Sequence, residues 1–120
     1  MGKTSGKAKI LYGEGDAEQL QAHLSVMEKA GYCVKTVVGR RTIEEAMRQD
    51  KYDLVVLGHT LTRDDRHHLP YMAKKANSSS RVLVIHASGK HPEVDAAIDS
   101  RDGDHVLLEA VAGLLQPAFA

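Results

Sequence analysis

The sequence predicts an α/β fold in which five parallel strands form one doubly wound sheet between two layers of helices. Short apolar runs alternate along the chain with segments whose apolar residues recur every three or four positions. The clearest run shows no alternation of apolar and polar residues, as is typical of a strand buried on both faces of a parallel sheet. The connections are short, and right-handed crossovers leave few topologies. We therefore expect a (βα)5 arrangement in three layers.

The run at residues 53–57 is the expected central strand of this sheet. It carries four consecutive apolar side chains and stops at Gly58, which is followed by His59 and Thr60. Parallel sheets of this kind place their chemistry at the carboxyl ends of their strands. The residues that follow this strand are therefore the first place to look for a functional site.

Capping signals set the limits of the first two helices. Asp16 is a suitable N-cap for a helix whose apolar stripe includes Ala17 and Met27, and Gly31 is a suitable stop. The spacing from Thr42 to Glu45 is that of a capping box, which predicts a short second helix. The strands that flank these helices are residues 9–12, 32–38 and 53–57.

The second half of the chain continues the alternation. Residues 63–68 form a polar, loop-like run, and Pro70 has no amide hydrogen to donate, so the third helix begins near residues 64–69 and ends near Asn77. Residues 81–85 form a buried apolar strand that follows a turn of serines.

The carboxyl-terminal part of the chain is interpreted as a helix, a strand and a helix. Pro92 can open a short helix that carries Val94, Ala97 and Ile98, because proline suits the first helical turn. A polar segment follows, and residues 105–107 are then the expected last strand. Residues 108–115 are the expected last helix.

The composition excludes several classes of partner. Sixteen basic and sixteen acidic side chains cancel, so no broad positive field is available to hold nucleic acid or anionic lipid. No apolar run is long enough to span a membrane or to serve as a signal peptide, and we expect a cytoplasmic protein. The length fits one domain over residues 1–120, with residues 1–7 as a disordered tail. The single cysteine, Cys33, starts an apolar strand and is expected to be buried.

Three segments of the sequence resemble those of a known family. They are Lys-Ile-Leu-Tyr-Gly-Glu-Gly-Asp at residues 9–16, Tyr-Asp-Leu-Val-Val-Leu-Gly at 52–58 and Arg-Val-Leu-Val-Ile-His-Ala at 81–87. Together they resemble the receiver domain of two-component response regulators, the CheY-like form of the flavodoxin-like fold, over nearly the whole chain. The resemblance implies a sheet with strand order 2-1-3-4-5 and a site at the carboxyl ends of strands 1, 3 and 4. It also implies a bacterial signalling or phosphorelay module.

The residues at the first part of the receiver site depart from the family's pattern. The resemblance implies an aspartate at the end of strand 3 that accepts a phosphoryl group, and Gly58 stands there. It also implies an acidic pair after strand 1 that holds Mg²⁺. Glu14 matches the first member, whereas Gly15 fills the second place and Asp16 lies one position further on. With two carboxylates lost, we expect Mg²⁺ binding to be weak or absent.

The remaining positions depart as well. The serine or threonine that the resemblance implies after strand 4 is replaced by His86. The lysine that ends strand 5 in the family falls on Leu108, and the aromatic switch residue of that strand falls on His105. We therefore expect no phosphorylation of an aspartate in this chain.

Histidines at the expected sheet edge raise a second hypothesis. In this interpretation His59 and His86 end neighbouring strands, and Glu14 lies on the strand beside them. Imidazole and carboxylate groups suit Zn²⁺, Ni²⁺ or Cu²⁺, so these three residues are candidate metal ligands. Histidines at strand ends more often bond backbone groups, and ligands from separate loops leave no spacing to test. We expect no metal and no other cofactor.

The sequence favours a binding module over an enzyme. The Gly13-Glu14-Gly15 turn lacks the third glycine of a dinucleotide fingerprint, and no phosphate loop or nucleophile elbow is present. We expect a degenerate receiver domain, a pseudo-receiver, that acts by binding another protein without aspartyl phosphorylation. The alternative is a small metal- or ligand-sensing domain, and histidine phosphorylation remains a third class.

The expected partner surface lies near the end of the chain. Receivers commonly pair through their fourth helix, fifth strand and fifth helix, which the resemblance places within residues 92–115. An apolar patch there would mark a contact with a second copy of the chain or with a protein partner. Its apolar residues are Val106, Leu107, Leu108, Val111, Leu114 and Leu115.

Overall fold

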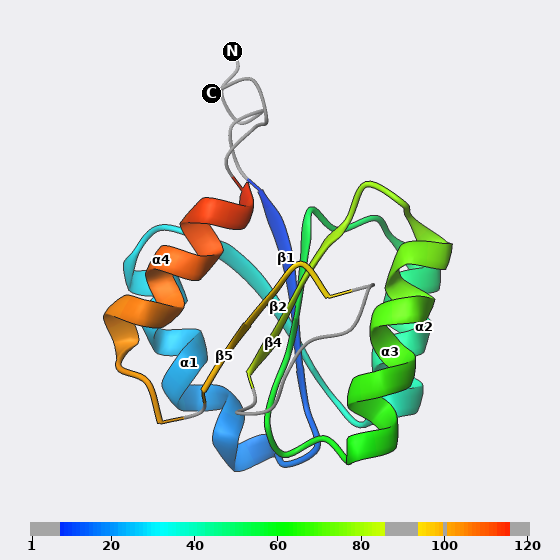
Figure 1. Ribbon diagram of the computed structural model, residues 1–120, viewed down its shortest axis with the longest axis horizontal. Helices are drawn as coiled ribbons and strands as arrows, with labels where there is room; N and C mark the ends of the chain where they lie inside the picture. The colour runs from blue at the N-terminus through cyan, green and yellow to red at the C-terminus, as the bar shows by residue number, and fades with distance from the viewer. Residues whose placement is uncertain (1–7, 86–93, 100, 116–120) are drawn as a thin grey trace.

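The chain folds into one parallel sheet with helices on both faces. The computed structural model describes residues 8–85, 94–99 and 101–115, and within these ranges it contains five strands and four helices (Figure 1). The expected tail at residues 1–7, His86 and Pro92 lie outside the described residues. The strands are β1 (Lys9–Glu14), β2 (Cys33–Val38), β3 (Leu54–Leu57), β4 (Arg81–Ile85) and β5 (Ala96–Ile98). The helices are α1 (Ala17–Lys29), α2 (Arg40–Gln49), α3 (Arg63–Ala76) and α4 (Asp104–Leu115).

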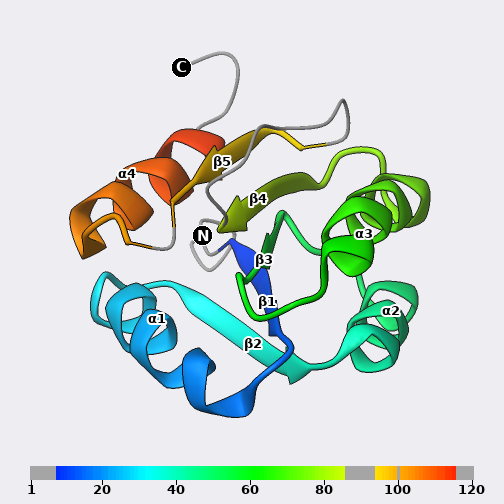
Figure 2. The same ribbon diagram turned by 60° about the horizontal axis from the view of Figure 1, so that its bottom comes forward.

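The strand order and the layers confirm the predicted fold class. All neighbouring strands are parallel and follow the order β2-β1-β3-β4-β5. Helices α2 and α3 cover one face of the sheet, and α1 and α4 cover the other (Figure 2). Leu11 belongs to the core under α2 and α3, whereas its neighbours Ile10 and Tyr12 belong to the core under α1 and α4. All four residues of β3 are buried, which explains their unbroken apolar run.

The register brings two strand ends together at the carboxyl edge of the sheet. Gly13 of β1 lies opposite Leu57 of β3, and the Gly58 N–H donates to the Gly13 carbonyl at 2.8 Å. Glu14 and Gly58 therefore end neighbouring strands at the same level. This is the edge where the sequence places the candidate site.

The predicted last strand and the helix before it are both wrong. Residues 105–107 begin α4, and residues 96–98 form β5, which pairs with β4 in the register Leu83 with Ala96 and Ile85 with Ile98. The periodic apolar residues after Asp104 belong to one longer helix, in which Leu107 and Val111 share a buried face. The strand at 96–98 is short and weakly apolar, so its pairing with β4, rather than a local pattern, determines its structure.

The third helix starts at Arg63, one residue before the predicted range, and includes the run that was expected to be loop-like. The polar run at residues 63–68 is helical, because the Thr62 side-chain oxygen caps α3 by accepting from the Asp65 N–H at 3.1 Å. Pro70 lies in the helix interior and is buried. The helix continues through it because Leu69 and Ala73 pack into the core on the same side.

Cys33 is exposed rather than buried. It begins β2, the edge strand, in which Val37 alone is buried. The prediction is wrong because an edge strand leaves the residue at its start uncovered, although the strand is apolar. No helix in the described ranges is long and apolar enough to cross a membrane.

Candidate functional site

The carboxylate of Glu14 lies where a side chain at position 58 would stand. Glu14 ends β1 and has no exposed surface. A Cβ atom built on Gly58 would lie 1.8 Å from Glu14 Cδ and 1.9 and 2.0 Å from its two oxygens. Such distances are far shorter than any non-bonded contact, so Glu14 in this position requires a glycine at 58. A carboxylate from the neighbouring strand thus occupies the start of the space that an aspartate at 58 would need.

Thr60 holds one oxygen of that carboxylate. Glu14 Oε1 accepts from the Thr60 N–H at 3.1 Å and from the Thr60 hydroxyl at 2.5 Å. The Thr60 oxygen in turn accepts from the N–H groups of Gly15 and Asp16, at 2.8 and 3.0 Å. One donated and two accepted bonds use the full capacity of a hydroxyl group. Thr60 therefore ties the loop after β3 to the turn after β1.

Tyr12 and His23 hold the other oxygen. The Tyr12 hydroxyl donates to Glu14 Oε2, and it lies 2.9 Å from His23 Nδ1. Since the single hydroxyl proton is used toward Glu14, the histidine must donate from Nδ1, which assigns its tautomer. Burial raises the pKa of Tyr12 well above its ordinary value, and its bond to Glu14 adds to this. Burial also lowers the pKa of His23 against the opposing effect of Glu14.

These four residues, Glu14, Thr60, Tyr12 and His23, form what we call the Glu14 cluster. They come from β1, α1 and the loop after β3, and the cluster supplies three hydrogen bonds to one fully buried carboxylate. Such bonds compensate the cost of taking a charged group out of water. The polar groups of the Glu14 cluster therefore satisfy one another's hydrogen bonds at the edge of the sheet.

Gly15 and Asp16 both have structural roles in the turn after β1. A Cβ on Gly15 would lie 2.3 Å from the Thr60 carbonyl oxygen, so an acidic side chain there would displace the loop after β3. The Asp16 side chain caps α1, as predicted, by accepting from the Glu18 N–H at 3.0 Å. Of the positions that the resemblance assigns to the acidic pair, Glu14 alone points into the sheet edge, and its oxygens are engaged.

His59 lies between Gly58 and Thr60, and the environment of its ring nitrogen Nδ1 is unusual. Its Nδ1 is buried and has no hydrogen-bond partner among the described residues. The candidate metal ligand His86 lies outside the described residues, so its distance to His59 and Glu14 is not defined. Within the described ranges, no group of three or more histidine, cysteine or acidic side chains is arranged to hold a metal ion.

Leu108 and His105 do not lie on the fifth strand. Both belong to α4, with His105 exposed and Leu108 half-buried. Because β5 ends at Ile98, the position that follows the fifth strand is Asp99, whose carboxylate accepts from the Arg101 N–H at 2.8 Å. The alignment of the strand-5 lysine with Leu108 was therefore misplaced. A carboxylate, not an aliphatic side chain, stands at that end of the sheet.

Sequence reasoning missed the roles of Tyr12, His23 and Thr60. One signal was available for Tyr12, because residues two apart in a strand share a face, which places its ring beside Glu14. The other two residues come from separate elements, and nothing in their spacing connects them to Glu14.

Comparison with known proteins gives structural matches alone. No protein-family model and no curated protein matches the sequence. The fold is similar to the signal receiver domain of an HD domain-containing protein from Pseudomonas fluorescens, with a TM-score of 0.82 and 14% identity over 96% of this chain and 91% of that one. A response regulator receiver protein from Sinorhizobium medicae gives a TM-score of 0.79 with 21% identity, covering 91% of this chain and 94% of that one. A CheY-like receiver domain protein from Methanospirillum hungatei gives 0.78 with 17% identity and coverages of 91% and 94%.

These identities are low, so the matches bear on the fold and not on the chemistry of the site. Each match extends over at least nine-tenths of both chains, and the strand order is the one that the resemblance implies. The chain has the fold of a response-regulator receiver domain.

Proposed function

We propose that this chain is a pseudo-receiver, a receiver-like signalling module that acts by binding a partner protein without phosphorylation of an aspartate. The observation that carries the proposal is the position of Glu14. Its carboxylate fills the space above Gly58 where the side chain of a phosphoacceptor would begin. The receiver fold supports the signalling role, and the occupied acceptor position supports independence from phosphorylation.

Glu14 is a poor replacement for the missing acceptor. A phosphoryl donor has to reach a carboxylate oxygen, and Glu14 has no exposed surface. Both oxygens already accept hydrogen bonds, from Thr60 on one side and Tyr12 on the other. Freeing an oxygen would leave buried donors unpaired, at a cost of about 1–3 kcal/mol for each. Glu14 is therefore not an accessible acceptor for phosphoryl transfer, and we expect no enzyme activity of the chain.

The electrostatics at the end of β5 support the same proposal. The resemblance implies a lysine at this point, where a cation would neutralise a phosphoryl group. Asp99 stands there instead, and its carboxylate is bonded to Arg101. An ion pair between Asp99 and Arg101, rather than a lone ammonium group, therefore stands at this position.

We place the partner surface on α4, in line with the pairing region of the family. Leu107 and Val111 are part of the core and cannot contribute to a contact. The other apolar side chains of the expected patch are half-buried and reach the surface in part: Val106, Leu108, Leu114 and Leu115. Exposed apolar surface of this kind suits a second copy of the chain or a protein partner. Sedimentation at increasing concentration, with Leu108→Glu as the variant, tests the homodimer.

Incubation with acetyl phosphate and Mg²⁺ tests the central claim. We expect the intact mass of the protein to stay unchanged, while a receiver domain that keeps its aspartate gains one phosphoryl group in the same reaction. A phosphoryl mass that appears on this chain and disappears in mild base would mean an acyl phosphate. That result would refute the proposal.

The metal-sensing alternative keeps one supporting observation, the unpartnered Nδ1 of His59. A buried nitrogen without a donor or acceptor is suited to a metal ion that a second ligand, such as His86, helps to hold. Addition of Zn²⁺ separates the two functions. A rise in melting temperature that is lost in both His59→Ala and His86→Ala favours the sensor, and no rise favours the pseudo-receiver.

A further inference from the structure

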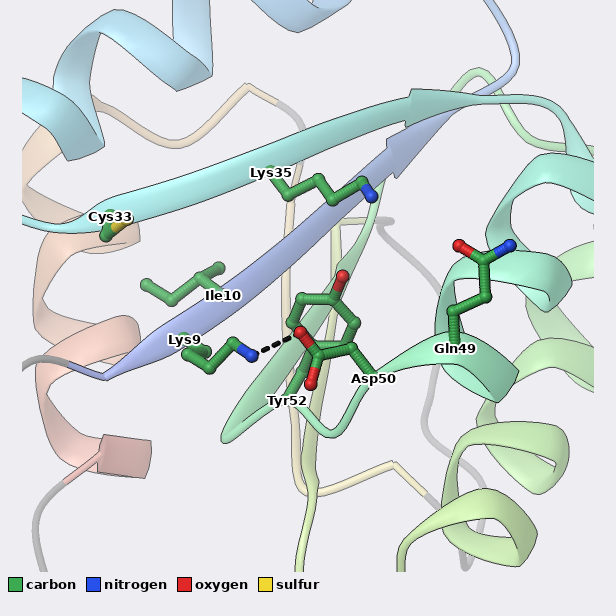
Figure 3. Close-up of a pocket in the computed structure, with 7 residues that line it drawn as sticks. All are labelled: Lys9, Ile10, Cys33, Lys35, Gln49, Asp50 and Tyr52. Carbon is green, nitrogen blue, oxygen red and sulfur yellow. Dashed lines mark hydrogen bonds and ion pairs between the residues drawn. The ribbon is translucent and has the colours of Figure 1, made fainter.

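A pocket opens at the amino ends of β1 and β2, at the edge of the sheet opposite the Glu14 cluster. It has a volume of about 300 Å³. Val37 of β2 packs under α2, and residues two apart in a strand share a face, so Cys33 and Lys35 lie on that same face. Neither is covered, because both are exposed. We call this the amino-edge pocket (Figure 3); its lining includes Lys9, Cys33, Lys35, Gln49, Asp50 and Tyr52.

Tyr52 brings a hydroxyl to the wall of the pocket. Only 5% of the residue is exposed, and its hydroxyl has no hydrogen bond to any described residue. Figure 3 shows the ring among the lining side chains, with its hydroxyl end toward the side where Lys35 lies. Burial raises the pKa of Tyr52, so the hydroxyl keeps its proton. A hydroxyl that can be reached from the pocket and has no partner among the described residues can donate to an acceptor that arrives from outside.

The charges around the pocket leave one cation unmatched. Lys9 is paired with Asp50, and its ammonium lies 5.6 Å from the centre of the Tyr52 ring. Lys35 makes no ion pair or hydrogen bond with a described residue. The lining holds two ammonium groups and one carboxylate, and the Asp53 carboxylate lies beside them, where it accepts from the Lys9 N–H at 2.7 Å. The Lys35 ammonium is on the side that the Tyr52 hydroxyl faces (Figure 3).

We propose that the amino-edge pocket binds a small organic anion, a carboxylate on a flat apolar body. Its carboxylate pairs with Lys35 and accepts from the Tyr52 hydroxyl, and its body lies against the Tyr52 ring and the aliphatic parts of the lysines that line the pocket. The volume is at the lower end of small-molecule sites, which fits a molecule of about one ring. Such a ligand would give the module an input that is independent of the Glu14 cluster. The proposal does not depend on the proposed function.

Sodium benzoate is a suitable probe, titrated into ¹⁵N-labelled protein with sodium chloride at matched ionic strength as the reference. We expect saturable shifts of the amide signals of Lys9, Cys33, Lys35 and Tyr52, with a dissociation constant on the order of millimolar for so small a ligand. Shifts that do not saturate, that equal those with chloride, or that spread over other basic side chains would overturn the proposal.

Two variants and a matched control identify the contacts. Tyr52→Phe and Lys35→Met should each weaken benzoate binding about tenfold, the effect of losing one charge-assisted hydrogen bond. Lys51→Met removes an exposed lysine next to Tyr52 that does not line the pocket, and it should bind like the parent. Equal affinity in Tyr52→Phe, Lys35→Met and the parent would refute the assignment, even if benzoate binds.

Two further measurements test the organic body and the location. Inorganic phosphate offers charge without an apolar part, so we expect it to bind more weakly; equal or tighter binding at the same residues would overturn the choice of an organic anion.

Cys33 is the single cysteine of the chain and lines the pocket. Saturating benzoate should slow its alkylation by neutral iodoacetamide in the parent, and unchanged alkylation would contradict binding at this place.

Discussion

The two edges of the sheet treat their polar groups in opposite ways. At the carboxyl edge, the buried carboxylate of Glu14 and the hydroxyl of Thr60 find all their partners within the chain. At the amino edge, the hydroxyl of Tyr52 and the ammonium of Lys35 have none among the described residues. A group that enters the first edge must break existing bonds, whereas one that enters the second satisfies open ones. At the edge where receivers carry out their chemistry, the side chain of Glu14 therefore fills the space above Gly58.

The largest loss of stability is expected when a side chain is added at position 58. We expect Gly58→Ala to destabilise the protein by about 3–5 kcal/mol, because the new Cβ displaces Glu14 from its buried hydrogen bonds. Urea unfolding measures the effect. Gly113→Ala is the control, since a Cβ there meets no atom within 4 Å, and it should be neutral or slightly stabilising.

A double-mutant cycle shows whether the loss comes from Glu14. In a Glu14→Ala background the clash is gone, so Gly58→Ala should cost about 2 kcal/mol less than in the parent. Strict additivity of the two changes would mean that Glu14 does not occupy the space above Gly58.

Removing the hydroxyl of Thr60 opens the same edge with a smaller effect. Thr60→Val leaves the N–H groups of Gly15 and Asp16 without their acceptor and takes one donor from Glu14. We expect a loss of about 2–4 kcal/mol in the free energy of unfolding. Thr36→Val on β2 makes the same change where the hydroxyl has no hydrogen bond to a described residue, and it should cost less than about 0.5 kcal/mol. Similar losses in both variants would contradict the role of Thr60.

The pH dependence of stability gives a smaller test of the Glu14 cluster. Burial lowers the pKa of His23 in the folded protein below its ordinary value of 6.5. The unfolded chain then binds the proton more readily, so His23 stabilises the fold fully above pH 6.5 and less as the pH falls toward its folded pKa. Thermal unfolding between pH 7.5 and 5 should show a loss of stability that is reduced in His23→Gln. An unchanged slope in that variant would exclude His23 as the source.

The sequence predicts the inner part of this structure well and its ends poorly. The run at residues 53–57 identifies the central strand because a strand covered on both faces has an unmistakable apolar pattern. The strand at 96–98 has no such pattern, since it depends on pairing with β4, and the apolar residues of α4 drew the expected strand to the wrong place. Local patterns report burial, and they say little about short edge elements.

One part of the candidate site could likewise be predicted from the sequence, and another part could not. Gly58 could be identified as the position without an acceptor, because a single position in a well-marked strand is enough for that. The placement of Glu14 above it could not, because it depends on the β1 to β3 register and on donors from α1 and the next loop. Tyr52 was treated only as the start of the central segment, and its unpaired hydroxyl becomes visible only when its surroundings are known.

The sharpest test makes one chemical change at both edges and has the smallest effect at the second. Tyr12→Phe removes a hydroxyl that donates to a buried carboxylate, and we expect a loss of about 1.5–3 kcal/mol. Tyr52→Phe removes a hydroxyl that has no partner among the described residues, from a ring that is also largely buried, and the free energy of unfolding should change by less than about 0.5 kcal/mol. Both variants keep the ring and its packing, so urea unfolding under the same conditions isolates the hydroxyl. A loss of stability in Tyr52→Phe as large as in Tyr12→Phe would mean that the Tyr52 hydroxyl is bonded within the chain, and the amino-edge pocket would then have no donor to offer.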